Sequence, residues 1–445
     1  MKPKKIFSLT KLWLMAMGTF VGSGIVSVVG FAAGQTGYSV WVAYLLACIV
    51  GFCSALPFFM MSSVMYFNGG TYSIATTFLG ERFGGAYIMS TFTSGIAIAM
   101  MASAFGSYVQ SVFPAMNIQL MAIGILTLFY IVNIMGIDFL ANVQKYSTAI
   151  LLIALGIFCV FCFVQAEPSS FSFSNPQFMT NGATGLLSAM AMLFFSTNAY
   201  DNNVYVMAKY TKKPLTNMPK GIFLTFLGLI AVYGGVSLAA VTGAGLETFA
   251  NQPLTPVAFA VMPELLAYLF LVCGPVLCLT TTINGCFASF TIAFEKATED
   301  GWFAPSFAAK NKAGAPWKIL TAVYIVCVVP LIFSVDISIL TNTTVFLSSI
   351  LVIPLLISLL KLPGMFPEAF ARNTMHLSPA VYKAGVVIAW CARGIIIYYS
   401  LSSLSVVNAV GSVIAVILCF LFAFLRHRTG KTKVQNSYSF DNDEE

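Results

Sequence analysis

The sequence predicts an all-α integral membrane protein with 12 transmembrane helices, and its composition is the first reason. Of the 445 residues, 59% are hydrophobic and only 8% are charged, whereas about 25% of the residues in an ordinary soluble domain are charged. The mean hydropathy is +0.89. So few charged side chains do not suffice to cover the surface of a soluble protein of this length. The composition therefore excludes a soluble enzyme, a disordered chain and a nucleic-acid-binding protein.

Hydropathy places the helices, because a helix needs about 20 apolar residues to cross a bilayer. The predicted spans are residues 12–33, 40–66, 87–112, 120–137, 147–164, 185–207, 222–241, 266–294, 319–333, 344–360, 384–399 and 406–424. The first of them follows a basic N-terminus, as a signal peptide would. It is longer than the core of a signal peptide and further spans follow it, so we interpret it as the first transmembrane helix.

The distribution of Lys and Arg predicts the orientation. If the N-terminus is cytoplasmic and the spans alternate, each of the 22 basic residues except Arg393 falls in a cytoplasmic segment. Cytoplasmic loops of membrane proteins carry such an excess of basic residues. Both termini are therefore expected in the cytoplasm. Because the first five spans and the next five begin on opposite sides, they are arranged as an inverted repeat would be.

The same pattern divides the chain into four expected parts. A cytoplasmic N-terminus, residues 1–11, precedes an inverted-repeat transport core of helices 1–10, residues 12–363. Peripheral helices 11 and 12 follow at residues 364–425. Residues 426–445 are polar and end in an acidic run, so we expect a disordered cytoplasmic tail.

Small and polar residues interrupt the first span. Residues 18–24 include three glycines and two hydroxyl residues, which weaken a helix. A break at Gly22, Ser23 and Gly24 would direct backbone N–H groups at a carboxylate. Close helix packing is the alternative, because Gly18 and Gly22 form a GxxxG pattern. The candidate substrate-binding residues of this span are Thr19, Gly22, Ser23, Gly24 and Ile25.

The sixth span contains a polar run at residues 196–203. Its backbone carbonyls could accept hydrogen bonds from an ammonium group, with Tyr200 as a lid. Asp201 is the only carboxylate clearly within a span, where ionisable groups are functional suspects, although capping a broken helix is the alternative. A loop beyond a misplaced helix end is the alternative for the whole run. The candidate substrate-binding residues are Ser196, Thr197, Asn198, Ala199, Tyr200 and Asp201.

Three further polar residues lie inside predicted spans. Arg393 would cost a few kcal/mol near the middle of a span unless it snorkels or pairs. Snorkelling or an interhelical contact is the favoured interpretation, and substrate binding is the alternative. Thr281 and Thr282 are weak candidates for a Na⁺ site, because hydroxyls in spans usually bond to their own helix. No other metal site and no cofactor is expected, since His376 and His427 fall in connecting or tail segments.

Short motifs follow the interrupted first span in a fixed order. They are Asn68-Gly69-Gly70-Thr71-Tyr72, Asn133 and Gly136 with Gln144 beyond them, Pro214 and Pro219, Asn284-Gly285, Asp300-Gly301 with Pro305, and Asn311-Lys312-Ala313-Gly314-Ala315-Pro316. Together with Gly22-Ser23-Gly24-Ile25, they resemble the motifs of the amino acid–polyamine–organocation (APC) superfamily of permeases. The resemblance covers about residues 10–320.

The resemblance implies a leucine-transporter-like fold of 5+5 inverted-repeat helices, with helices 1 and 6 broken, and transport by alternating access. It implies that N–H groups of residues 22–24 hold the substrate carboxylate, that carbonyls around residues 196–199 hold the amino group, and that an aromatic residue near Tyr200 gates the site.

The sequence departs from the family pattern in three places. Lys209-Tyr210 stands near a Glu-Glu pair common in the family, which puts a cytoplasmic gate contact in doubt. Leu151 replaces a Lys that supplies a cation near the first-span break in many members, which favours exchange or another coupling ion. Asn198 or Ala199 replaces a Gly in the sixth span, so the side-chain pocket does not follow by analogy.

We therefore expect a secondary active transporter, a permease or exchanger for amino acids or related amines, in the cell inner (plasma) membrane. A channel or sensor on the same fold and a carrier specific for polyamines or other organocations are the alternatives. An enzyme is not expected, because apart from Asp201 the spans hold no acid–base set. The expected partners are the small-molecule substrate, membrane lipid and a coupling H⁺ or Na⁺, without nucleic acid.

Overall fold

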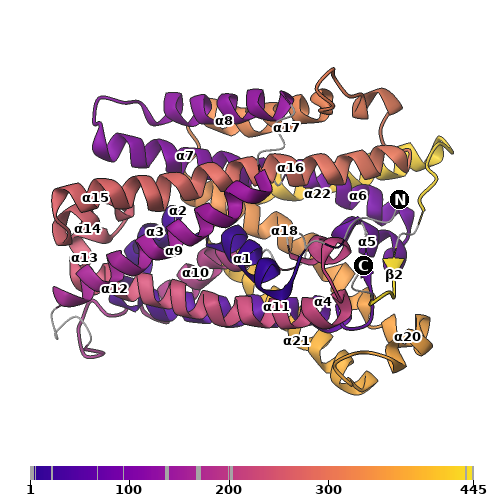
Figure 1. Cartoon of the computed structure of the whole chain (residues 1–445), viewed down its shortest axis with the longest axis horizontal. Coiled ribbons are helices and arrows are strands. Elements are labelled where there is room, and N and C mark those ends of the chain that lie inside the picture. The colour runs from indigo at the N-terminus through magenta and orange to yellow at the C-terminus, as the bar shows by residue number, and fades with distance from the viewer. Residues whose placement is uncertain are drawn as a thin grey trace.

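The fold is an assembly of helices that run mostly along one long axis (Figure 1). The computed structural model describes residues 5, 7–21, 24–67, 69–93, 95–135, 140–166, 172–198, 200, 204–435 and 438–442. The N-terminus, α5 and β2 lie at one end of the long axis, which we call the terminal end, and α13, α14 and α15 lie at the other (Figure 1).

The first part of the chain forms helices and one short strand. Their bounds are α1 Leu9–Phe20, α2 Gly24–Ser27, α3 Val29–Thr36, η1 Gly37–Ser39, α4 Val40–Met61, β1 Tyr66–Phe67, α5 Gly70–Leu79, α6 Glu81–Thr93, α7 Gly95–Val112, α8 Ile118–Ile134 and α9 Leu140–Val164. The helices α7 and α8 pack side by side, with α17 against both.

The second part begins near the middle of the bundle and ends beside the N-terminus. Its bounds are α10 Gly182–Leu193, η3 Phe194–Thr197, η5 Tyr205–Tyr210, α11 Pro214–Leu229, η6 Ile230–Gly234, α12 Gly235–Gly243, α13 Leu246–Phe249, α14 Leu254–Val261, α15 Glu264–Leu271, η7 Val272–Val276, α16 Leu277–Glu299, η8 Pro305–Ala308, α17 Trp317–Ile332, α18 Ile337–Leu359, α19 Leu362–Met365, α20 Pro367–Ala371, α21 Pro379–Ser402, α22 Val406–Arg428 and β2 Tyr438–Ser439.

Several helices begin where the sequence provides a cap. Asp336, Ser378 and Ser405 precede α18, α21 and α22, and each side chain accepts a hydrogen bond from a backbone N–H of the first turn. Such caps satisfy donors that have no partner within the helix. In α21 the cap is followed by Pro379, which suits the first helical position because that position needs no N–H.

The helices are long and apolar enough for a multi-pass membrane protein. Within the described residues, 8 helical segments meet the length and composition required to cross a membrane, and three shorter apolar helices accompany them. These segments coincide with the predicted second to twelfth spans. The predicted first span, residues 12–33, is divided among α1, α2 and α3, so the count of twelve crossings stays a prediction.

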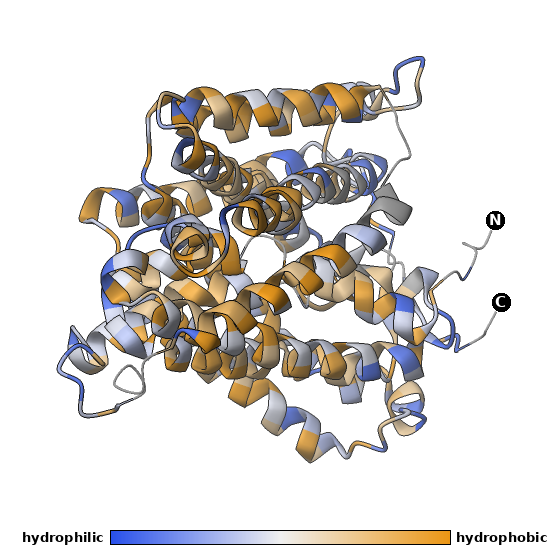
Figure 2. Cartoon of the chain, turned by 60° about the vertical axis from the view of Figure 1, so that its left-hand side comes forward, coloured by the Kyte–Doolittle hydropathy of each residue, from blue (hydrophilic) through white to orange (hydrophobic). Residues whose placement is uncertain are grey.

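Hydropathy is distributed as a bilayer requires. Apolar residues dominate the helices, and hydrophilic residues gather in the connecting segments and near the chain ends (Figure 2). Large apolar side chains are exposed along α22, among them Val410, Ile417 and Leu421. In water an exposed surface of this kind would be unfavourable, whereas lipid tails are its natural solvent.

The C-terminal tail differs from the prediction. The sequence predicted disorder from residue 426, but α22 continues to Arg428 and β2 pairs antiparallel with β1. The Asn442 side chain accepts a hydrogen bond from Leu215 N at 3.0 Å and lies 3.1 Å from Thr216 Oγ1. The prediction was therefore wrong for these described residues. Composition alone did not reveal that Tyr438 and Phe440 have an aromatic partner, Phe366.

Candidate substrate site

The regular helix of the first span ends in the middle of the bundle. The helix α1 ends at Phe20 and α2 begins at Gly24. Gly24 and Ile25, two of the five candidates predicted in this span, are buried at the start of α2. Gly22, Ser23 and the Thr19 side chain lie outside the described part of the structure.

The sixth span changes its helical form at the polar run. The α-helix α10 ends at Leu193 and gives way to the 3-10 turn η3, which contains Ser196 and Thr197. Asn198 follows with a non-helical backbone, φ −101° and ψ 37°. Tyr200 is also described, whereas Ala199 and Asp201 lie outside the described residues. Within the described part of the run, Ser196 and Thr197 are buried in η3 and so do not lie in a loop beyond the helix end, whereas the rest of the run stays a prediction.

The two segments touch each other directly. A Cβ atom placed on Gly24 would lie 2.2 Å from Ser196 Cβ. On the other side of η3, a Cβ on Gly51 of α4 would lie 2.4 Å from Thr197 Oγ1. Only glycine permits backbone approaches this close. Residues that the sequence predicted separately for the first and sixth spans are thus brought together at Gly24 and Ser196.

Two tyrosines hold this junction, and sequence reasoning missed both. The Tyr233 hydroxyl donates to Phe20 O at 2.6 Å and to Ser196 O at 3.2 Å. The Tyr44 and Ser196 hydroxyls are 2.9 Å apart. Tyr233 lies in the π turn η6 between α11 and α12, a local widening that often occurs at functional positions. Tyrosines are common in apolar helices, so neither residue stood out in the sequence.

Aromatic rings surround the predicted lid. The rings of Phe20 and Tyr200 are 4.5 Å apart, and the Phe52 ring lies 6.2 Å from that of Tyr200. Tyr200 is only 2% exposed, and its hydroxyl has no hydrogen-bond partner among the described residues. Tyr200 therefore covers the end of the first helix in this conformation.

Arg393 contacts the sixth span. Its side chain is buried, so it does not snorkel, and one guanidinium nitrogen donates to Asn198 Oδ1 at 2.6 Å. The favoured interpretation of an interhelical contact agrees with this geometry.

The two threonines considered for Na⁺ bond to their own helix. The Thr281 hydroxyl donates to Leu277 O at 2.9 Å and the Thr282 hydroxyl to Cys278 O at 2.9 Å. This is the ordinary behaviour of threonine in an apolar helix.

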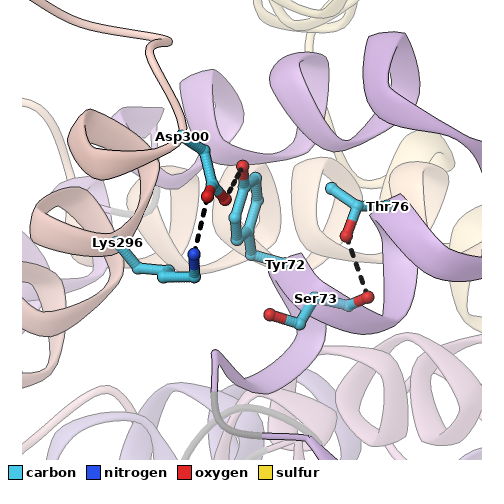
Figure 3. Close-up of polar contacts among 5 residues, drawn as sticks. All are labelled: Tyr72, Ser73, Thr76, Lys296 and Asp300. Carbon is cyan, nitrogen blue, oxygen red and sulfur yellow. Dashed lines mark hydrogen bonds and ion pairs between the residues drawn. The ribbon is translucent and has the colours of Figure 1, made fainter. Parts of the chain in front are cut away.

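The sequence motifs meet near the terminal end. Tyr72 of α5 donates to Asp300 Oδ2 at 2.8 Å, and Lys296 Nζ lies 2.6 Å from Asp300 Oδ1 (Figure 3). Burial, together with the negative charge of Asp300, raises the pKa of Tyr72, so its hydroxyl stays a donor. Asn133 also donates to Asn284 Oδ1 at 2.6 Å. Motif residues far apart in sequence are therefore hydrogen-bonding partners.

Comparison with known proteins identifies the family. A family model described as amino acid permease matches residues 7–432, so the chain belongs to the amino acid permease family of the APC superfamily. It is a transmembrane protein of that family, as the sequence motifs predicted.

Individual relatives are distant. An uncharacterized protein of Methanocaldococcus jannaschii is 23% identical over 292 residues, which cover 64% of this chain and 66% of the relative. The branched-chain amino acid permease BcaP of Lactococcus lactis is 24% identical, over 51% of this chain and 54% of the relative. A methylthioribose transporter of Bacillus subtilis is 26% identical, over 56% and 57%. The matched region thus spans between about half and two thirds of these relatives.

Proposed function

We propose that the protein is a secondary active transporter that moves amino acids or related amines by alternating access. The observation that carries this proposal is the contact between Gly24, the first residue of α2, and Ser196, in the 3-10 turn η3. At each of these residues the α-helix of an apolar segment is interrupted inside the bundle. Interrupted helices of this kind supply backbone hydrogen-bonding groups to a polar solute within a membrane. Family membership and the transporter names of the relatives support the same function.

The substrate is held by backbone groups in this proposal. The N-terminus of α2 at Gly24, with Gly22 and Ser23 before it in the chain, receives the carboxylate. The ammonium group, which has three donors, donates to the carbonyls of Phe20 and Ser196. In this conformation the Tyr233 hydroxyl contacts both carbonyls. Tyr200 closes over the site. Asn198 and Asp201 complete the part of the proposed substrate site that the sixth span contributes.

The overall arrangement proposed is that of twelve helices in two inverted repeats of five, plus two more, in the cell inner membrane. The interrupted segments fall in the first and sixth predicted spans, which are the first helices of the two repeats. The terminal end is placed in the cytoplasm because it carries Arg82, Lys296 and Arg426.

Exchange of substrates is the proposed mode, with H⁺ or Na⁺ coupling as the competing possibility. Leu151 of α9 provides no charge where many family members have a Lys that supplies a cation. The Thr281 and Thr282 hydroxyls, the candidates for a Na⁺ site, donate to carbonyls of their own helix. A channel or sensor is the second candidate function. Saturation and stimulation by internal substrate separate a carrier from it.

Counterflow in proteoliposomes tests the proposal. Vesicles are loaded with one unlabelled amino acid or polyamine at a time, and entry of the same labelled compound is followed at equal pH without a Na⁺ gradient. We expect transient accumulation for at least one amino acid. Failure with the whole panel, repeated with Na⁺ and proton gradients and with protein that shows an intact melting transition, would overturn the transporter proposal.

A further inference from the structure

A guanidinium group is buried inside the helical bundle. Arg393 lies in the interior of α21 and is 2% exposed. A charged side chain at such a depth costs several kcal/mol unless hydrogen bonds compensate for it, and intramembrane charges are therefore retained mainly where they have a task. The chain has 22 basic residues, and Arg393 is the one that the hydropathy pattern places within a span.

Arg393 is directed at the sixth-span interruption. Its Nη2 donates to Asn198 Oδ1 at 2.6 Å, its Nη1 donates to Ser349 Oγ of α18 at 3.2 Å, and its guanidinium carbon lies 4.9 Å from the centre of the Phe194 ring. The contacts with Phe194 and Asn198 are with η3 and with the residue that follows it. The short bond to Asn198 is charge-assisted, which makes it stronger than an ordinary amide hydrogen bond.

Both polar atoms of the Asn198 side chain are engaged by other helices. Its oxygen accepts from Arg393 of α21, and its Nδ2 donates to Ser348 Oγ of α18 at 3.1 Å. Asn198 comes directly after η3, at the point where the backbone leaves helical geometry. The position of this backbone is therefore coupled to α18 and α21.

A small cavity lies on this side of the interruption. A cavity of about 10 Å³, with room for about one water molecule, lies between α4, η3 and α21. Arg393, Asn198 and Tyr200 line it together with Ser54 of α4. The hydroxyls of Ser54 and Tyr200 are buried and have no partner among the described residues. Beside this cavity, the Asn198 side chain is held by its hydrogen bonds to Arg393 and Ser348.

We propose that Arg393 is a positioning residue for transport, which acts through Asn198 on the backbone of residues 196–198. It keeps the Ser196 carbonyl next to Phe20 O, where the amino group of the substrate is to bind. Helix α21 is then a working part of the transport cycle rather than a peripheral support. This inference rests on the proposed function, because it assigns Arg393 a role in the same site.

A double-mutant cycle tests the inference. Arg393→Lys keeps the charge, but a single ammonium group cannot reproduce the two-armed contact with Asn198 and Ser349. We expect Arg393→Lys and Asn198→Ala each to raise the KM for exchange roughly tenfold, as the loss of one charge-assisted hydrogen bond does. The double variant should be no worse than Asn198→Ala alone, since Arg393 acts through that residue.

Two results would overturn the inference. One is an unchanged KM in Arg393→Lys, and the other is a double variant whose KM rises by the product of the two single effects. Ser400→Ala is the matched control, because Ser400 is on the same helix, is fully buried and has no hydrogen-bond partner among the described residues. Its KM should equal that of the wild type. A merely structural Arg393 would lower the melting temperature and the amount of active protein, and it would leave KM unchanged.

A second pair of variants covers the case in which Arg393→Lys does not fold. Both variants change the site and lose the bond to Ser348, but Asn198→Asp keeps an acceptor for Arg393 and Asn198→Leu removes it. We therefore expect KM to rise about tenfold more in Asn198→Leu than in Asn198→Asp. Equal KM values for the two variants would overturn the inference. Absence of counterflow in the wild type would instead contradict the proposed function itself, so the two failures are distinguishable.

Discussion

Gly24 shows how a single residue controls the junction. Its hydrogen faces Ser196, and a Cβ atom there would lie 2.2 Å from Ser196 Cβ, which is far inside any permitted contact. The segment is buried on all sides, so the neighbours cannot move away without displacing η3. The sequence indicated the importance of this glycine, but only the structure identifies the atom that excludes a side chain.

Gly24→Val is expected to abolish uptake while the protein still inserts into the membrane. The valine side chain would separate α2 from η3 and fill the carboxylate site. Counterflow and the amount of protein in the membrane fraction measure the two effects. Gly124→Ala is the control, because a Cβ on Gly124 meets nothing within 4 Å. Normal uptake by Gly24→Val would contradict the site assignment.

Tyr233 is the second residue whose effect follows from its contacts. Tyr233→Phe removes a hydroxyl that contacts both Phe20 O and Ser196 O. We expect the exchange rate to fall about tenfold, because two buried carbonyls lose a donor. Tyr382→Phe should leave the rate unchanged, since the Tyr382 hydroxyl has no partner among the described residues. Equal rates for both variants would show that the Tyr233 hydroxyl is dispensable.

At the scale of elements, α5 and the end of α16 are joined by one buried carboxylate. Asp300 is 2% exposed and receives hydrogen bonds from Tyr72 and Lys296 (Figure 3). A buried carboxylate is costly unless its oxygens have donors. These contacts join α5 to the end of α16 at the terminal end.

Tyr72→Phe is expected to destabilise this end by roughly 1–2 kcal/mol, because it removes a donor from a buried carboxylate. The melting temperature of the purified protein should fall by a few degrees. The control is Thr76→Val, since among the described residues the Thr76 hydroxyl donates to Ser73 O, at 2.9 Å within its own helix (Figure 3). If both variants have the melting temperature of the wild type, the Tyr72–Asp300 hydrogen bond contributes nothing to stability.

For the whole molecule, the C-terminal segment connects parts that are distant in sequence. Besides β2 and Asn442, Lys433 N donates to Asp300 O at 2.9 Å and Arg426 Nε donates to Gly301 O at 3.1 Å. The chain thus returns to β1, to the end of α16 and to the start of α11. These contacts draw four segments of the terminal end into one assembly.

Deletion of residues 434–445 should therefore lower the melting temperature by several degrees. It removes the β1–β2 pairing, the rings of Tyr438 and Phe440, and both hydrogen bonds of Asn442. The control is Gly411→Ala in α22, because a Cβ on Gly411 meets nothing within 4 Å, and it should not lower the melting temperature. A deletion variant that melts at the temperature of this control would mean that the segment contributes no stability.

The sequence predicted local features well because each depends on neighbouring residues. The apolar runs predicted spans at residues 344–360 and 384–399, which lie within α18 and α21, although these helices begin earlier, at Ile337 and Pro379. The glycines before α2 and the polar run after α10 were recognised because they interrupt long apolar segments. The tail was mistaken because its partners lie far away in the sequence, as the separation of 227 between Leu215 and Asn442 shows.

By itself, the sequence determined that this protein is helical, lies in a membrane and belongs with the amino acid permeases, since hydropathy, basic residues and motifs are properties of the chain alone. Only the tertiary structure decided which residues meet. Tyr44 and Ser196 are 152 positions apart, Arg393 and Asn198 are 195 apart, and Tyr72 and Asp300 are 228 apart. Every apolar helix can pack against several others in lipid, so hydropathy does not select its partner. The partner of each helix is determined by close contacts at glycines and by buried hydrogen bonds. These contacts join residues far apart in the sequence, so they are visible only in the assembled structure.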